Sequence, residues 1–99
     1  MSVDTGAAAP TEVERRVTVV NRRGLHARAA AKLVECARKF EAAITVTRDG
    51  NTVSALSIMG LMTLGASSGV TLDVRAKGRD ASAALDAVAT LFAAKFNED

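Results

Sequence analysis

Hydrophobic and polar residues alternate in four stretches of the chain, a pattern typical of β-strands that bury one face. The alternation covers residues 13–20, 44–47, 52–55 and 70–76. Asp49 and Gly50 lie between the second and third stretches, and an Asp-Gly pair in that place favours a tight hairpin turn. We therefore predict four strands, of which the middle two form a hairpin.

Hydrophobic residues recur at helical spacing in three other stretches. The Ala-rich residues 27–40 form the first predicted helix. A short second helix follows Ser57, which would cap its N-terminus, and stops at Gly65. Asp80 would cap the last helix in the same way. The apolar stripe of that last helix consists of Ala84, Leu85, Val88, Leu91 and Phe92.

The order β-α-β-β-α-β-α places the chain in the α+β class. An amphipathic helix buries its apolar side against the apolar face of a sheet, so we expect two layers. The predicted sheet has four strands and is mainly antiparallel, with the three helices on one face. A chain of 99 residues forms one domain, assigned here to residues 13–99. Residues 1–12 are predicted to be a disordered leader, because small and polar residues dominate them.

Composition and charge exclude several classes of function. The chain has no Trp, no Tyr and only three Phe, too few aromatic rings for a platform that stacks nucleic-acid bases. Its formal net charge of +2 gives little attraction for polyanions. One His and one Cys leave no credible metal site, and no cofactor is implied. Cys36 lies in an apolar helical pattern and is predicted to be a buried, inert thiol.

The chain contains no apolar run long enough to cross a bilayer. Its N-terminus lacks the positively charged start and hydrophobic stretch of a signal peptide. We therefore expect a cytoplasmic protein without a membrane partner.

The candidate chemistry centres on His26, at the junction between a loop and the first long helix. Gly24 allows the preceding backbone an unusual turn. A helix start presents N–H groups without intrahelical acceptors and the positive end of the helix dipole, and these are the groups that bind phosphate. A neutral imidazole is nucleophilic. The backbone N–H groups of Ala27, Arg28 and Ala29, with the Arg28 guanidinium, would solvate a phosphoryl group on His26.

The position of His26 alone leaves a second interpretation open. A lone His near a helix N-terminus is often a cap or a surface residue. In that case Arg22, Arg23 and Lys32 would be ordinary solvated charges around it.

The segment Gly-Leu-His-Ala-Arg at 24–28 and the Ala-rich helix after it resemble the active site of HPr. HPr is the histidine-containing phosphocarrier family of the phosphoenolpyruvate-dependent phosphotransferase system. The resemblance runs from about Val13 to the C-terminus and includes the order of elements, Asn21, the Asp-Gly hairpin and the Leu-Gly stop at 64–65. The ending at 91–99 is similar to that of the nitrogen-type branch of the family.

The resemblance implies an open-faced β-sandwich and a carrier rather than an autonomous enzyme. Enzyme I, charged by phosphoenolpyruvate, would phosphorylate His26 on Nδ1, and the phosphorylated chain would donate to an EIIA-type protein. Arg28 would be the phosphate-side partner. A monomer satisfies this role.

The resemblance also implies a regulatory site. Ser57 matches the serine that HPr kinase/phosphorylase modifies in some family members, and a plain N-cap is the alternative interpretation. Ile58, Met59 and Met62 match a patch that docks partner proteins, whereas Leu61 and Leu64 are expected in the core. For Met59 and Met62, partial burial is the alternative to exposed docking.

Ala29 departs from the family pattern, which usually has Pro directly after the Arg. Pro suits the first turn of a helix and pre-sets its backbone. Ala retains the helix with less pre-organisation and adds one N–H donor. We expect a modest change in the rate of phosphoryl transfer, with the carrier role retained.

The main alternative function belongs to another class of protein. Such a chain would be a regulatory binding module with the HPr fold that acts through protein–protein contacts, without phosphoryl relay. Retention of both His26 and Arg28 disfavours this alternative.

Overall fold

Four strands form one antiparallel sheet in residues 12–98, the part of the chain that the computed structural model describes. Their order across the sheet is β1-β4-β2-β3, and every pairing is antiparallel, where the sequence predicted a mainly antiparallel sheet. Residues 1–11 of the predicted leader lie outside the described part, and Glu12 belongs to β1. The strands are β1 (Glu12–Thr18), β2 (Ala43–Arg48), β3 (Asn51–Ser54) and β4 (Thr71–Lys77).

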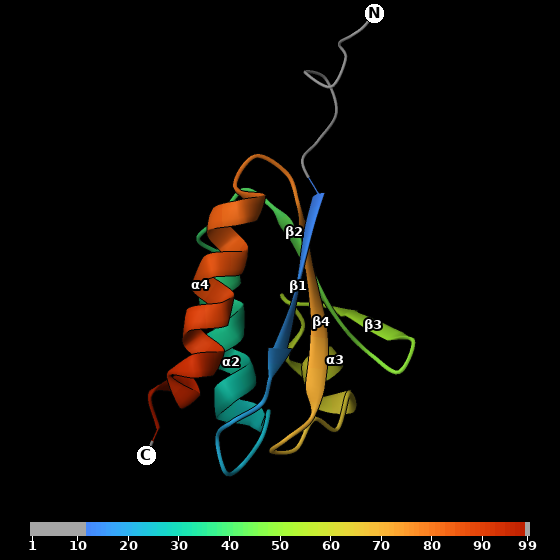
Figure 1. The fold of residues 1–99 in the computed structure, drawn as a ribbon, viewed down its shortest axis with the longest axis vertical. Helices are drawn as coiled ribbons and strands as arrows, with labels where there is room; N and C mark the ends of the chain where they lie inside the picture. Colours follow the sequence, from blue (N-terminus) through green and yellow to red (C-terminus); the bar gives the residue numbers. More distant parts are fainter. Residues whose placement is uncertain (1–11, 99) are drawn as a thin grey trace, which may run out of the picture.

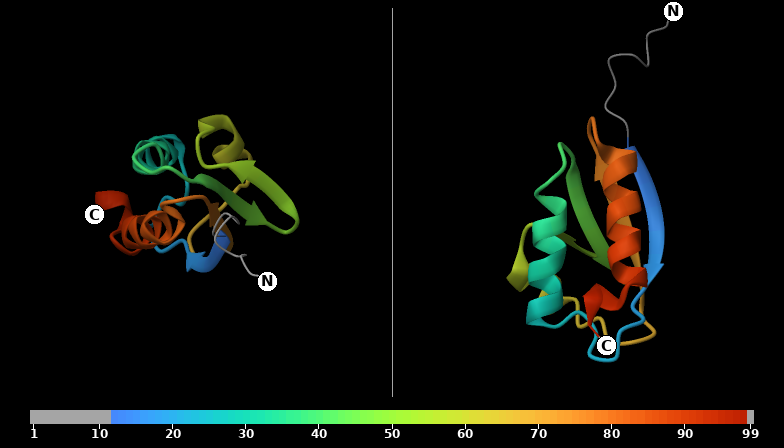
Figure 2. Two further views of the ribbon diagram at one scale, coloured as in Figure 1. Left: turned by 90° about the horizontal axis from the view of Figure 1, so that it is seen from above. Right: turned by 90° about the vertical axis from the view of Figure 1, so that its left-hand side faces the viewer.

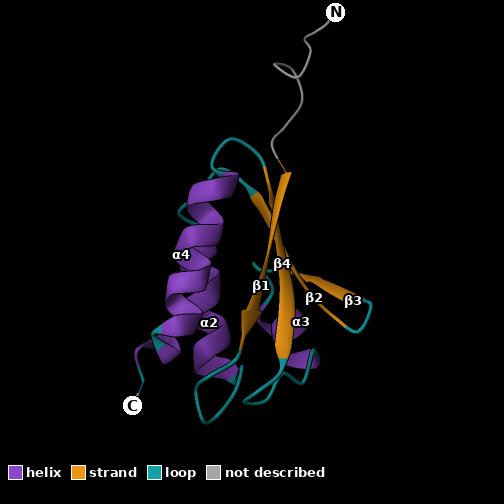
Figure 3. Ribbon diagram, viewed as in Figure 1, coloured by secondary structure: helices purple, strands orange, loops and turns teal. Residues whose placement is uncertain are grey.

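Three α-helices cover one face of this sheet, as predicted (Figures 1 and 2). Helix α4 lies against β1 and β4, and α2 lies beside α4 (Figure 3). Helix α3 lies next to α2 and β3. Within residues 12–98, none of the helices is long and apolar enough to cross a membrane. The helices are α2 (Ala27–Ala37), α3 (Ile58–Thr63) and α4 (Ala81–Ala93).

The core lies between the sheet and the helices and consists of the residues that the alternation marks as apolar. Side chains on successive strand positions point to opposite faces, so every second residue of β4 is buried against the helices. The predicted stripe of α4 is buried except for Leu91, which is half-buried. Leu33 brings α2 into the same core, and Leu61 and Leu64 join it as expected.

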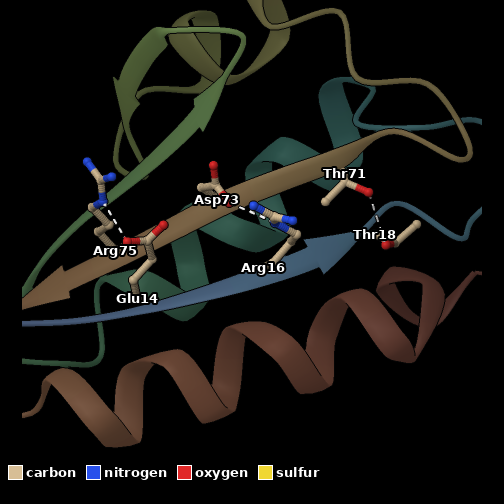
Figure 4. A network of polar contacts seen from close by, with 6 residues as sticks. All are labelled: Glu14, Arg16, Thr18, Thr71, Asp73 and Arg75. Atoms are coloured by element: carbon tan, nitrogen blue, oxygen red, sulfur yellow. Dashed lines mark hydrogen bonds and ion pairs between the residues drawn. The ribbon is translucent and has the colours of Figure 1, made fainter.

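The opposite face of the sheet carries polar pairs between β1 and β4, which we call the open-face ladder (Figure 4). The paired residues stand directly opposite one another in the strand register. Their polar atoms are 3.2–3.4 Å apart. Such cross-strand pairs support the register that the buried valines already require. The pairs are Glu14 with Arg75, Arg16 with Asp73, and Thr18 with Thr71.

The predicted hairpin turn joins β2 to β3. Asp49 has φ 50° and Gly50 has φ 82°. Two successive positive φ values match the twist of antiparallel strands, and Asp and Gly are the residues that adopt them at least cost. The Asp-Gly prediction is therefore confirmed.

One predicted helix boundary needs correction, and one predicted N-cap makes a different hydrogen bond from the one expected. The first helix ends at Ala37 and not at Phe40, because Lys39 and Phe40 donate to the carbonyls three residues back in a tightened last turn. Asp80 is the N-cap residue of α4, as predicted, but its carboxylate makes no capping bond to the helix. The Oδ2 atom of Asp80 instead accepts a hydrogen bond from the backbone N–H of Glu41, 2.7 Å away.

Candidate functional site

The loop before α2 holds His26 at the helix start. Gly24 has φ 71°, and a Cβ at this position would lie 2.6 Å from the carbonyl oxygen of Ala66. Leu25 donates to that same carbonyl at 2.9 Å, and the N–H of His26 donates to the carbonyl of Gly24 at 2.9 Å. The loop lies so close to residues 66–67 that no residue larger than glycine fits at Gly24. This close contact and the hydrogen bond from Leu25 fix the backbone that leads into His26.

His26 is the N-cap residue of α2, directly before Ala27, with extended backbone at φ −79° and ψ 179°. The first helical hydrogen bond runs from Ala30 N to His26 O at 2.8 Å. The N–H groups of Ala27, Arg28 and Ala29 precede that bond and have no acceptor inside the helix. His26 therefore stands beside the positive end of an eleven-residue helix, as predicted.

The imidazole of His26 contacts the C-terminal end of the chain. Its Nε2 lies 2.7 Å from Oε2 of Glu98, and the two side chains are 17% and 21% exposed. The other oxygen of Glu98 accepts a hydrogen bond from Nδ2 of Asn21 at 3.0 Å. Asn21 is fully buried, and its Nδ2 also donates to the carbonyl of Gly24 at 2.7 Å. We call Asn21, His26 and Glu98 the histidine cluster.

The histidine cluster favours an ionised carboxylate. The hydrogen bond from Asn21 lowers the pKa of Glu98 below its ordinary value, and the hydrogen bond with His26 adds to that effect. The positive charge of Arg23 contributes in the same direction. Partial desolvation opposes them without reversing the shift.

A short turn, η2 (Lys95–Asn97), brings Glu98 to His26. All three of its residues have φ between 55° and 61°, a left-handed conformation that non-glycine residues seldom adopt. Phe96, the middle residue of η2, is fully buried and packs edge-on against Phe92, with ring centroids 4.8 Å apart. Lys32 on α2 donates to the carbonyl of Phe96 at 2.5 Å.

Sequence reasoning did not assign a role to Glu98 or predict η2. The C-terminal residues were noted for their likeness to the nitrogen-type branch, and Asn21 for its place before the His. No local pattern marks Lys95, Phe96 and Asn97 as left-handed, because Gly is absent from the turn. The hydrophobic Phe96 among polar residues is the one signal that the end of the chain returns to the core.

The basic residues near His26 take different places. Arg23 lines a shallow concavity of about 300 Å³ with His26, Met62 and Ser67. Arg28 is exposed and lines a groove of about 500 Å³ between α2 and α4. Its predicted role as a phosphate-side partner stays a prediction.

Ser57 and the predicted docking residues lie on and before α3. The Oγ of Ser57 accepts a hydrogen bond from the N–H of Gly60 at 2.9 Å, so Ser57 is an N-cap of α3. Ile58, Met59 and Met62 are exposed, Met59 most of all at 75%. Of the two interpretations of Met59 and Met62, the structure favours exposure.

Comparisons with known proteins match most of the chain to one family. The family model described as "PTS HPr component phosphorylation site" matches residues 13–94. The chain belongs to the HPr family. It is thus a phosphocarrier protein, with the phosphoryl relay that this family name implies.

Several HPr proteins are similar to the chain over nearly their whole length. The phosphocarrier protein NPr of Shewanella violacea is 48% identical over 88 residues, which cover 89% of this chain and 97% of the relative. The phosphocarrier protein HPr of Xylella fastidiosa is 47% identical, with coverage of 88% and 98%. The crystal structure of HPr-C-His from Thermoanaerobacter tengcongensis has a TM-score of 0.84 and 41% identity, with coverage of 88% and 98%. The predicted open-faced HPr fold is therefore confirmed.

Proposed function

We propose that this chain is a cytoplasmic phosphocarrier that accepts a phosphoryl group on Nδ1 of His26 from Enzyme I. The phosphorylated chain then donates the group to an EIIA-type protein. The observation that supports this role is the position of His26, directly before three backbone N–H groups that have no helical acceptor. A histidine at that place presents a nucleophilic nitrogen beside a ready anion site.

The anion site suits a group that must be passed on. The dipole of α2 and the N–H groups of Ala27, Arg28 and Ala29 would offset part of the phosphoryl charge, and a helix terminus typically contributes ~0.3–1 kcal/mol to such an interaction. The guanidinium of Arg28 is proposed as the phosphate-side partner. Stabilisation of this moderate size supports a carrier, because a more stable phospho-form would not donate.

The exposed residues beside the site are proposed to dock partners. Ile58, Met59 and Met62 lie on α3, and Met62 also borders the concavity at His26. Methionine side chains adapt to partners of different shape, as a carrier that meets both a donor and an acceptor requires.

Ser57 is proposed as a site of regulatory phosphorylation by HPr kinase/phosphorylase. It directly precedes Ile58, so a phosphate there would place negative charge at the docking surface. The approach of Enzyme I would weaken. A variant Ser57→Ala would lose the capping bond to Gly60 but keep the phosphorylation of His26.

The acceptor is proposed to be a signalling EIIA protein rather than a sugar transporter. The C-terminal ending resembles that of the nitrogen-type branch, and an NPr protein is among the similar relatives. Transfer from the phosphorylated chain to EIIA domains of both kinds, followed side by side, tests this choice. Faster transfer to a sugar-type EIIA would contradict it.

Ala29 offers a test of pre-organisation at the anion site. Ala29 is fully buried in the first turn of α2, where its N–H has no helical acceptor. Ala29→Pro fits this position and is expected to change the transfer rate and the lifetime of the phospho-form modestly, because it fixes φ and removes one N–H donor. Unchanged values of both quantities would contradict the predicted effect of Ala29.

Intact-mass analysis tests the carrier role. The chain is incubated with phosphoenolpyruvate and Enzyme I, beside His26→Ala and a known HPr as a positive control. We expect a single acid-labile phosphoryl adduct on the wild type and none on His26→Ala. If the known HPr is labelled and this chain is not, the regulatory binding module becomes the better account.

A further inference from the structure

We propose that Glu98 is a positioning residue for phosphoryl transfer: it holds the imidazole proton of His26 on Nε2 and so leaves the lone pair of Nδ1 free to attack. The inference deepens the proposed function and rests on it. It assigns a role in the reaction to a side chain 72 residues away from His26 in the sequence.

The contact between Glu98 and His26 determines which nitrogen carries the proton. A neutral imidazole has one nitrogen that donates and one that accepts, whereas an ionised carboxylate only accepts. At 2.7 Å from Oε2 of Glu98, Nε2 must therefore be the donor. Nδ1 makes no hydrogen bond to any side chain within residues 12–98. The protonated nitrogen faces the carboxylate, and the nitrogen with the lone pair is the other one.

Asn21 fixes the orientation of the carboxylate. Its Nδ2 donates to Oε1 of Glu98 at 3.0 Å, so that each oxygen of Glu98 has its own partner. The same Nδ2 donates to the carbonyl of Gly24, which ties Glu98 to the loop that carries His26. In the described part of the chain, Oδ1 of Asn21 is buried without a partner, which costs free energy. The two hydrogen bonds from Nδ2 are therefore the contacts by which Asn21 orients Glu98.

The backbone conformation of η2 places Glu98 beside His26. Three successive non-glycine residues in left-handed conformation are unfavourable on their own. Burial of Phe96 against Phe92 and the hydrogen bond from Lys32 to the Phe96 carbonyl hold the turn in place. Glu98 follows directly after this turn. The contacts of Phe96 thus offset the cost of the left-handed backbone at residues 95–97, and this backbone places Glu98 beside His26.

The arrangement suits transfer in both directions. When the chain is charged, the lone pair of Nδ1 forms a bond to phosphorus, and the bond from phosphorus to the donor breaks with its electron pair left on the donor. The ring keeps its Nε2 proton and becomes positively charged, and the carboxylate of Glu98 faces that charge. When the group is passed on, the electron pair returns to Nδ1 and the neutral ring forms again. No proton moves in either step.

Nitrogen-15 NMR on the unphosphorylated chain tests the contact without any partner protein. His26 is the single His of the chain, so its two ring nitrogens give unambiguous signals. We expect protonated Nε2, unprotonated Nδ1 and a slowly exchanging Nε2–H signal in the wild type. Glu98→Ala should lose that slow signal and gain a measurable fraction of the Nδ1–H tautomer, with Glu98→Gln between the two. Asp49→Asn removes an exposed carboxylate in the hairpin and should behave as the wild type.

Transfer kinetics test the role in the reaction. With phosphorylated Enzyme I as donor, Glu98→Ala is expected to lower kcat about tenfold and leave KM unchanged, which is the lower end of the loss seen when a carboxylate that orients a metal-bound histidine is removed. A wild-type chain that takes up no phosphoryl group would overturn the proposed function and this role together. A labelled chain whose Nε2–H signal and kcat do not change in Glu98→Ala would overturn the role of Glu98 alone.

Discussion

The open-face ladder and the histidine cluster are both built from polar side chains that are distant in sequence, yet they differ in burial and in whether strand pairing brings them together. The ladder joins exposed residues that the strand register already places opposite each other. The histidine cluster joins the loop before α2 to the end of the chain and contains the fully buried Asn21. Exposed pairs can be lost with little effect, whereas a buried group that loses its partner costs free energy. The difference indicates that the ladder supports the register and that the cluster serves the site.

Removal of the Phe96 ring, which holds η2 against the core, is expected to lower the free energy of unfolding more than any other proposed change. Phe96→Ala deletes a fully buried ring that packs on Phe92 and should lower the free energy of unfolding by ~3–5 kcal/mol. The contact between Glu98 and His26 should be lost with it. Urea unfolding gives the energy, and Met59→Ala is the control, with an expected change within about 0.5 kcal/mol because Met59 is exposed. Equal effects of the two changes would contradict the anchor role.

Removal of the buried amide should have the next largest effect. Asn21→Ala removes one of the two donors to the carbonyl of Gly24 and the donor to one oxygen of Glu98, which should cost ~1–3 kcal/mol. Asn51 is exposed in the hairpin, so Asn51→Ala is the matched control. Thermal unfolding of both variants gives the comparison. A loss no greater than that of the control would mean that the amide is not an organising contact.

The pH dependence of the free energy of unfolding tests the contact that Glu98 makes in the histidine cluster. Because the folded state lowers the pKa of Glu98 from 4.5, its ionised form contributes stability that is present above that value. The contribution is lost as the pH falls through the lowered pKa. The difference in unfolding free energy between the wild type and Glu98→Gln should therefore stay constant at neutral pH and shrink only below the ordinary range of a glutamate. A difference that disappears above that range would contradict the assignment.

The open-face ladder should give the smallest effect. A double-mutant cycle on Arg16 and Asp73, with Ala at each position, is expected to give a coupling energy of ~0.2–1 kcal/mol. Added salt should reduce it, because the Arg16 side chain is 74% exposed. A coupling as large as the loss in Asn21→Ala would erase the distinction between the two regions.

The features that could be predicted from the sequence are those that depend on local patterns. Strands, the Asp49–Gly50 turn and the core stripe of α4 follow from local periodicity and turn chemistry, and His26 stands at a helix start as its neighbours indicate. Asp80 is correctly predicted as the N-cap of α4, but the partner of its carboxylate, the N–H of Glu41, could not be predicted because it is distant in sequence.

The part of the site that could not be predicted depends on the tertiary fold. Glu98 reaches His26 only after three residues adopt an unfavourable backbone conformation that a buried Phe96 maintains. Local propensity argues against such a turn, so only the packed structure can reveal the contact.

The measurement that tests the central claim most directly is phosphorus and nitrogen-15 NMR on the phosphorylated, labelled chain. Coupling between phosphorus and a ring nitrogen identifies the atom that carries the phosphoryl group. We expect the coupling at Nδ1 of His26, with the proton retained on Nε2 beside Glu98. A phosphoryl group on Nε2, or on any residue other than His26, would contradict the account.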